Sequence, residues 1–100
     1  MRGYELTERA IRDIRSAREW YDRENVDLGN RFVDSVLAAV RAARERPTSF
    51  AEVEDGARRV LCDRFPFHVY FEVTRDDRIR VLAVYHASRD PQQWSDVDRI

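Results

Sequence analysis

The sequence contains no lysine, so all 18 of its basic residues are arginines. A Schiff-base lysine and the lysine of a phosphate-binding loop are therefore excluded, and cation chemistry is left to guanidinium groups that stay protonated in proteins. The 19 acidic residues bring the formal net charge to -1. This balance excludes a nucleic-acid binder that depends on a high overall positive charge, although it is compatible with a local basic patch.

Cysteine and glycine are also scarce. The single cysteine, Cys62, cannot form a disulfide within the chain, and three glycines are too few for a glycine-rich phosphate loop. One cysteine and two histidines, His68 and His86, are too few soft ligands for a zinc cluster, so we expect no metal and no other cofactor. We interpret Cys62 as a buried, unreactive thiol.

Long hydrophobic runs are missing as well. No apolar stretch approaches the roughly 20 residues needed to cross a membrane, and the first six residues lack the apolar centre of a secretion signal. We therefore expect a cytoplasmic location and no membrane partner. A chain of 100 residues, of which 43% are hydrophobic, is expected to form a single small domain over residues 1–100.

The N-terminal half carries two helical patterns. From Thr7 to about Glu24 the apolar residues recur every three or four positions, and Thr7 can cap the start of a helix. A second stripe begins at Leu28 and stops at Arg46-Pro47, so the two helices should form an antiparallel hairpin with a short connection. The large aromatic residues of this region are predicted to lie in the core or between the helices: Trp20, Tyr21, Phe32 and Phe50.

The pattern changes to that of β-strands after a loop predicted at residues 48–56. Residues 57–62 predict a short strand, residues 67–73 alternate between apolar and polar side chains, and residues 79–86 form the second strand of a hairpin. Residues 3–6 are a further candidate strand. The expected fold class is α+β, with the helical hairpin packed on a three- to four-stranded antiparallel sheet.

Short motifs in the strand region carry a family resemblance. They are Arg58-Arg59-Val60-Leu61, the Arg-Phe-Pro-Phe of residues 64–67, and the His-x-x-Arg-Asp-Pro-x-x-Trp that runs from His86 to Trp94. With them, nearly the whole chain resembles the RelE/ParE superfamily of bacterial toxins. The resemblance implies the toxin of a type II toxin-antitoxin system. Such a toxin is neutralised by a cognate antitoxin and reaches operator DNA only through that antitoxin.

The superfamily has two main branches. RelE-like members cleave messenger RNA in the ribosome, whereas ParE-like members inhibit DNA gyrase by protein-protein binding and serve in plasmid stabilisation. In the nucleases that resemble this chain, an arginine stands where His68 stands here, and a tyrosine or a His-Tyr pair lies near the C-terminus. This chain has Trp94 there, and an indole cannot transfer a proton. Both departures favour a ParE-like toxin that is not an enzyme.

Two alternatives stay open. In a RelE-like mRNA interferase, His86 would be the general acid or base, and Arg59, Arg64 and Arg89 would surround the phosphate. A degenerate toxin fold could instead act only as an antitoxin-binding module. The ParE-like interpretation assigns contacts with the target or the antitoxin to the following residues: Arg58, Arg59, Arg80, Arg89 and Trp94.

The same residues also have structural interpretations. Arg58 and Arg59 on a short strand can pair with acidic residues of the preceding loop, and His86 at a strand end can be a hydrogen-bonded structural histidine. Trp94 can pack back on the sheet as readily as it can contact a target.

Overall fold

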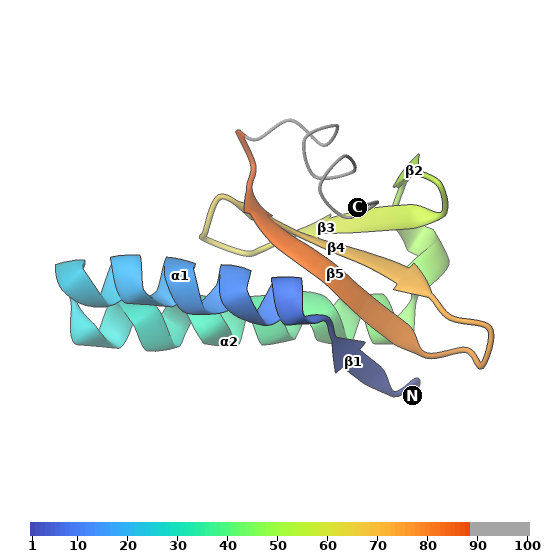
Figure 1. The fold of residues 1–100 in the computed structure, drawn as a ribbon, viewed down its shortest axis with the longest axis horizontal. Coiled ribbons are helices and arrows are strands. Elements are labelled where there is room, and N and C mark those ends of the chain that lie inside the picture. The colour runs from blue at the N-terminus through green and yellow to red at the C-terminus, as the bar shows by residue number, and fades with distance from the viewer. Residues whose placement is uncertain (89–100) are drawn as a thin grey trace.

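The structure of the protein is a computed structural model, and it describes residues 1–88 (Figure 1). In chain order the elements are β1 (Tyr4–Leu6), α1 (Glu8–Glu24), α2 (Val26–Glu45), the short 3-10 helix η1 (Pro47–Ser49), β2 (Glu52–Glu54), β3 (Ala57–Leu61), β4 (Phe67–Val73) and β5 (Ile79–His86). The two helices form one layer and cover one face of a sheet with the strand order β1-β5-β4-β3-β2. No helix within residues 1–88 is long and apolar enough to span a membrane.

Two side-chain caps fix the helical hairpin. The Thr7 hydroxyl accepts the N–H of Ala10 at 3.1 Å and begins α1, as predicted. Asn25 has an extended backbone that ends α1, and its side-chain oxygen accepts the N–H of Asp27 at 2.9 Å to begin α2. The connection is therefore a single residue, which explains the sharp reversal of the chain seen in Figure 1.

The predicted α+β class, with a helical hairpin packed on a mostly antiparallel sheet, is confirmed, and the sheet has five strands where three to four were predicted. β1 pairs with β5 in parallel, and β2 lies in the segment that was predicted to be a loop. The turn between β2 and β3 is made by Asp55 and Gly56, whose φ values are 46° and 82°. An Asp-Gly pair is a strong hairpin signal in a sequence, so β2 could have been anticipated from it. The strands predicted at 67–73 and 79–86 are confirmed.

The main core lies between the helices and the sheet. Phe32 is fully buried at its centre, with its ring centroid 5.0–5.5 Å from those of Tyr21, Phe65 and Phe67. Aliphatic residues of both layers complete this core: Val36, Val40, Val69, Val81 and Val84. The predicted packing of Tyr21, Phe32 and Phe50 is confirmed, but Trp20 is 54% exposed and does not belong to the core.

A β-bulge in β5 decides which of its side chains face the helices. The pairing with β4 shifts between Tyr70 and Phe71, which leaves Leu82 as the extra residue. Ile79 faces the core before the bulge. After the bulge His86 lies on the same face, because it pairs with a β4 residue packed against the core. Uninterrupted alternation from Ile79 would have placed His86 on the opposite face.

Candidate functional site

The outer face of the sheet, turned away from the helices, combines aromatic and basic side chains. Pairing of the strands places Arg59 of β3 beside Tyr70 of β4, and His68 of β4 beside Tyr85 of β5. Tyr70 and Tyr85 are only 1% and 3% exposed. Arg9 reaches this face from α1, with its guanidinium carbon 4.8 Å from the centre of the Tyr85 ring. The two tyrosine rings form a second buried cluster with Ala57 and Ala83, and the guanidinium groups supply the charge of this face.

His68 is the histidine of this face. Its ring atom Nδ1 is buried and has no hydrogen-bond partner within residues 1–88. Burial is the main cause that lowers the pKa of His68, and the nearby charge of Arg59 lowers it further. The imidazole is therefore held in its neutral form, which leaves Arg59 as the cation of the pair.

This arrangement predicts a pH dependence of folding. Because the pKa of His68 is lower in the folded protein than in the unfolded chain, the unfolded chain takes up the proton first as the pH falls. Above the unfolded pKa of about 6.5, His68 should therefore not affect the stability of the fold. Below that pH, it should destabilise the fold more and more as the pH falls. When the pH is lowered from about 7 to about 5, the free energy of unfolding should fall less for His68→Gln than for the wild type. Urea unfolding at each pH would measure this difference. Parallel stability curves for the two proteins would contradict this effect.

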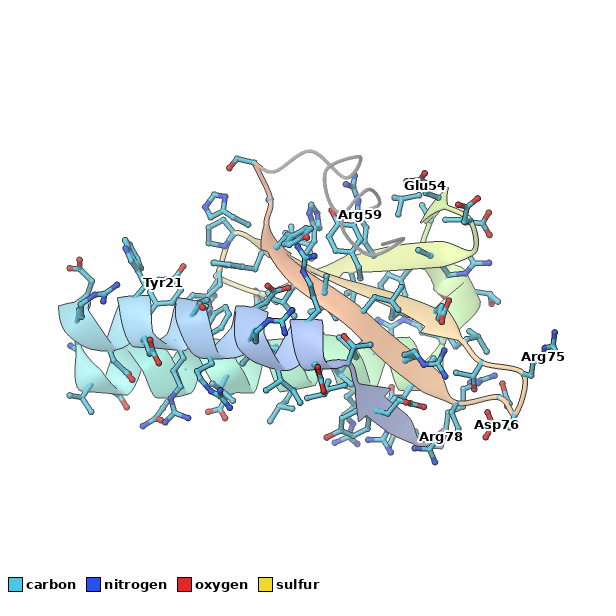
Figure 2. The ribbon with its side chains drawn as sticks, viewed as in Figure 1. Tyr21, Glu54, Arg59, Arg75, Asp76 and Arg78 are labelled. Atoms are coloured by element: carbon cyan, nitrogen blue, oxygen red, sulfur yellow. The ribbon has the colours of Figure 1, made fainter. Side chains whose placement is uncertain are left out.

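Arg58 and Arg59 are neighbours in sequence but differ in their contacts. Arg58 donates from Nη1 to the carbonyl of Phe50 at 2.7 Å and lies 4.0 Å from the carboxylate of Glu52. Its structural interpretation, an ion pair with the preceding segment, is therefore confirmed. Arg59, labelled at β3 in Figure 2, makes no hydrogen bond or ion pair within residues 1–88. Of the two, Arg59 is the cation left for a partner.

Arg80 is held by carboxylates on both sides. Its guanidinium lies 3.6 Å from Glu5 of β1 and 3.1 Å from Glu72 of β4. These pairs are partly exposed and contribute little to stability, but they neutralise the charge that Arg80 would offer to a partner. Its predicted contact with a target or an antitoxin would require these pairs to open.

The residues of the nuclease alternative are separated in the structure. His86 lies on the core side of the sheet, whereas Arg59 lies on the outer face. The Nδ1 atom of His86 accepts the N–H of Ser88 at 3.2 Å and lies 2.8 Å from its hydroxyl oxygen, which fits a structural histidine that closes the turn after β5. Arg64 projects from the β3–β4 turn with its side chain 88% exposed. The other two predicted site residues, Arg89 and Trp94, lie outside the described residues.

A pocket of about 820 Å³ lies between α1 and the C-terminal end of β5. Its lining among the described residues consists of Asp13, Ser16, Ala17, Trp20, Tyr21, Pro66, Phe67, Val84, His86 and Ser88. None of these is an arginine, although arginine is the only basic residue of the chain apart from histidine. Sequence reasoning missed this pocket because Trp20 was assigned to the core. The signal was that Trp20 stands one position outside the helical stripe that contains Tyr21.

The single cysteine belongs to the main core and is not among the described residues that line the pocket. Cys62 is 3% exposed, and burial raises its pKa to about 11. A thiol with so high a pKa is not a nucleophile near neutral pH, so the prediction of a buried, unreactive cysteine is confirmed.

Two helices on a mostly antiparallel five-stranded sheet carry the strand motifs described above. The family described as "ParE toxin of type II toxin-antitoxin system, parDE" matches residues 4–91. The chain therefore belongs to the ParE toxin family.

A solved structure supports the same fold. The structure titled "Chromosomal ParDE TA system from P. aeruginosa" is similar with a TM-score of 0.74, covering 86% of this chain and 96% of that chain. The two sequences share 19% identity, so this likeness concerns the fold. No curated protein sequence matches the chain.

Proposed function

We propose that this protein inhibits DNA gyrase by protein-protein binding and is neutralised by a cognate antitoxin. Membership of the ParE family over residues 4–91 is the observation that carries the proposal. The toxin and its antitoxin would act in the cytoplasm, where gyrase and its DNA are found.

The placement of the candidate catalytic groups supports a toxin that is not an enzyme. Cleavage of RNA requires a proton-transfer group and several cations within hydrogen-bond reach of one phosphate. His86 and Arg59 lie on opposite faces of the sheet, and Arg64 projects from a turn. Binding to a protein target needs no such convergence and can use surface groups that lie apart.

The antitoxin is proposed to cover the helical hairpin and the edge of the sheet with an apolar and acidic segment. Arg59 supports the acidic part, because a guanidinium without an ion pair within residues 1–88 favours a carboxylate partner. The exposed indole of Trp20 supports the apolar part, because buried tryptophans are frequent anchors of protein interfaces.

The proposal is tested with purified toxin in two assays. We expect the toxin to inhibit DNA supercoiling by gyrase and to leave ribosome-bound messenger RNA intact in a reconstituted translation reaction. Premixing with the product of the adjoining reading frame should restore supercoiling. Codon-specific cleavage of the messenger RNA, with supercoiling unaffected, would overturn the proposal in favour of the RelE-like alternative.

His86→Gln is the matched variant for both assays. Glutamine keeps hydrogen bonding at this position but cannot transfer a proton, so the variant should retain most of the inhibition. Loss of a catalytic acid or base would instead lower activity by about a hundredfold or more. The variant should be compared at equal concentrations of folded protein, because His86 also packs on Phe67 with ring centroids 5.3 Å apart.

A further inference from the structure

Arg64, in the turn between β3 and β4, adopts a backbone conformation that arginine seldom takes. Its φ is 69°, in the left-handed region where the Cβ of most residues is crowded. Residues 1–88 contain three non-glycine residues with positive φ, and the other two are Asp55 and Asp77. Aspartate enters this region more readily, because its short polar side chain can form local hydrogen bonds. Among the described residues, Arg64 therefore carries the backbone strain that its residue type does not relieve.

Contacts on both sides of Arg64 hold the turn in this shape. The hydroxyl of Ser35 in α2 donates to the carbonyl of Asp63 at 2.6 Å. Phe65 belongs to the aromatic core, with its ring centroid 5.0 Å from that of Tyr21. Because the residues before and after it are both anchored, Arg64 cannot leave the left-handed region without disturbing the fold.

The side chain of Arg64 does little for the fold within residues 1–88. It is 88% exposed, and the carboxylate of Asp63, 4.0 Å from its Nε atom, is itself 90% exposed. An ion pair between two groups so exposed contributes little to stability. Strained residues tend to cluster at binding and catalytic sites, where the conformation serves the function. The strain at Arg64 thus points to a role in recognition.

We propose that Arg64 is a contact residue for the protein target, and that its guanidinium binds a carboxylate on the surface of that target. The inference rests on the proposed function in so far as the target is gyrase. The anchored turn holds the base of the arginine side chain in one place before binding. Such preorganisation lowers the entropy that is lost when the complex forms.

A rigid turn suits a folded partner better than the antitoxin segment proposed above. A segment that becomes ordered on binding can adjust its own backbone to the place where it meets a guanidinium. The backbone of a folded surface moves little on binding, so the cation must already stand in the correct position. The strain at Arg64 therefore favours the target over the antitoxin as its partner.

The charges of the turn favour a protein surface over DNA. The turn presents an anion and a cation side by side, because Asp63 and Arg64 are both exposed. A DNA backbone offers only negative charge and is bound by several cations together, so Asp63 would be repelled by it. A protein surface carries both signs of charge, and a guanidinium can form two parallel hydrogen bonds with one of its carboxylates.

The structural part of the inference is tested by the stability of Arg64→Asn. Asparagine is tolerated in the left-handed region, so the variant should keep the turn while it loses the guanidinium. We expect its melting temperature to equal or exceed that of the wild type. A lower melting temperature would show that the arginine side chain stabilises the fold through a contact elsewhere in the chain, and would overturn the inference.

The recognition part is tested by binding of the toxin to purified gyrase in the absence of DNA. Arg64→Asn should raise the Kd by at least about tenfold, the loss expected for an arginine that anchors an interface. Arg75→Asn is the matched control, because Arg75 is an exposed arginine in the turn at the other end of β4. Its Kd should change by less than about twofold. Affinity of Arg64→Asn for the product of the adjoining reading frame should stay at the wild-type value.

Four outcomes would contradict these expectations in different ways. An unchanged Kd of Arg64→Asn for gyrase would overturn the contact, while inhibition by the wild type would stand. A loss of affinity for the antitoxin as large as that for gyrase would overturn the choice of partner. A loss that appears only when gyrase holds DNA would assign the guanidinium to a phosphate instead. Failure of the wild type to bind gyrase would overturn the proposed function, and the inference with it.

Discussion

Phe32→Ala is expected to lower the free energy of unfolding by about 3–5 kcal/mol, the usual loss for deleting a buried aromatic ring. Phe32 is fully buried and touches three other aromatic rings, so no neighbouring side chain can readily fill the cavity. A domain of this size has only about 5–15 kcal/mol of stability in total. Urea unfolding followed by circular dichroism would measure the change, and much of the variant should be unfolded at physiological temperature.

Leu37→Ala provides the matched control for this prediction. Leu37 lies on the same helix, is 44% exposed and is not part of the buried core. Its replacement should change the unfolding free energy by no more than about 1 kcal/mol, since it leaves no enclosed cavity. Equal losses for the two variants would contradict the position of the core between α2 and the sheet.

Arg59→Glu is expected to weaken the complex with the antitoxin by about 30-fold or more, which corresponds to ~2 kcal/mol. Arg59 is a cation that has no ion pair within residues 1–88. The substitution replaces it with a carboxylate, which would repel the proposed acidic segment of the antitoxin. Removing an attraction between charges also makes affinity less sensitive to salt. A titration of the adjoining reading frame's product over a series of salt concentrations would therefore show a lower affinity and a shallower slope.

Arg75→Glu is the control for the change in net charge. Arg75 lies in the turn between β4 and β5, at the far end of the sheet from Arg59 (Figure 2). Its reversal should alter affinity by less than threefold. Wild-type affinity and salt dependence for Arg59→Glu would show that the antitoxin does not contact the outer face at β3.

Local signals predicted most of the fold. Thr7 marked the start of the first helix, Arg46-Pro47 the end of the second, and alternation gave the bounds of β4. The edges of the sheet were predicted less well. β2 was placed in a loop, although the Asp55-Gly56 turn is a local signal for its hairpin with β3. The candidate strand at residues 3–6 is confirmed as β1, but a pattern in three residues cannot specify that it pairs with β5 in parallel.

The candidate site was less predictable, because it depends on which face each side chain occupies. Arg58 and Arg59 have the same chemistry, yet one is held by Phe50 and Glu52 while the other has no ion pair within residues 1–88. Trp20 was predicted to lie in the core or between the helices because it is a large aromatic residue, but it is exposed and lines a pocket. Arg58 and Arg59 differ because they lie on opposite faces of β3, and the place of Trp20 depends on how α1 packs against β5. A one-dimensional pattern contains neither arrangement.

The extra residue at Leu82 changes how this chain must be aligned with its relatives. A relative that lacks the bulge needs a one-residue gap opposite Leu82 for its core-facing positions to match those from Val84 onward. An ungapped alignment of that strand would equate His86 with a position on the other side of the sheet. Functional roles transferred between homologues across this strand therefore require the gap to be placed before the histidine is compared.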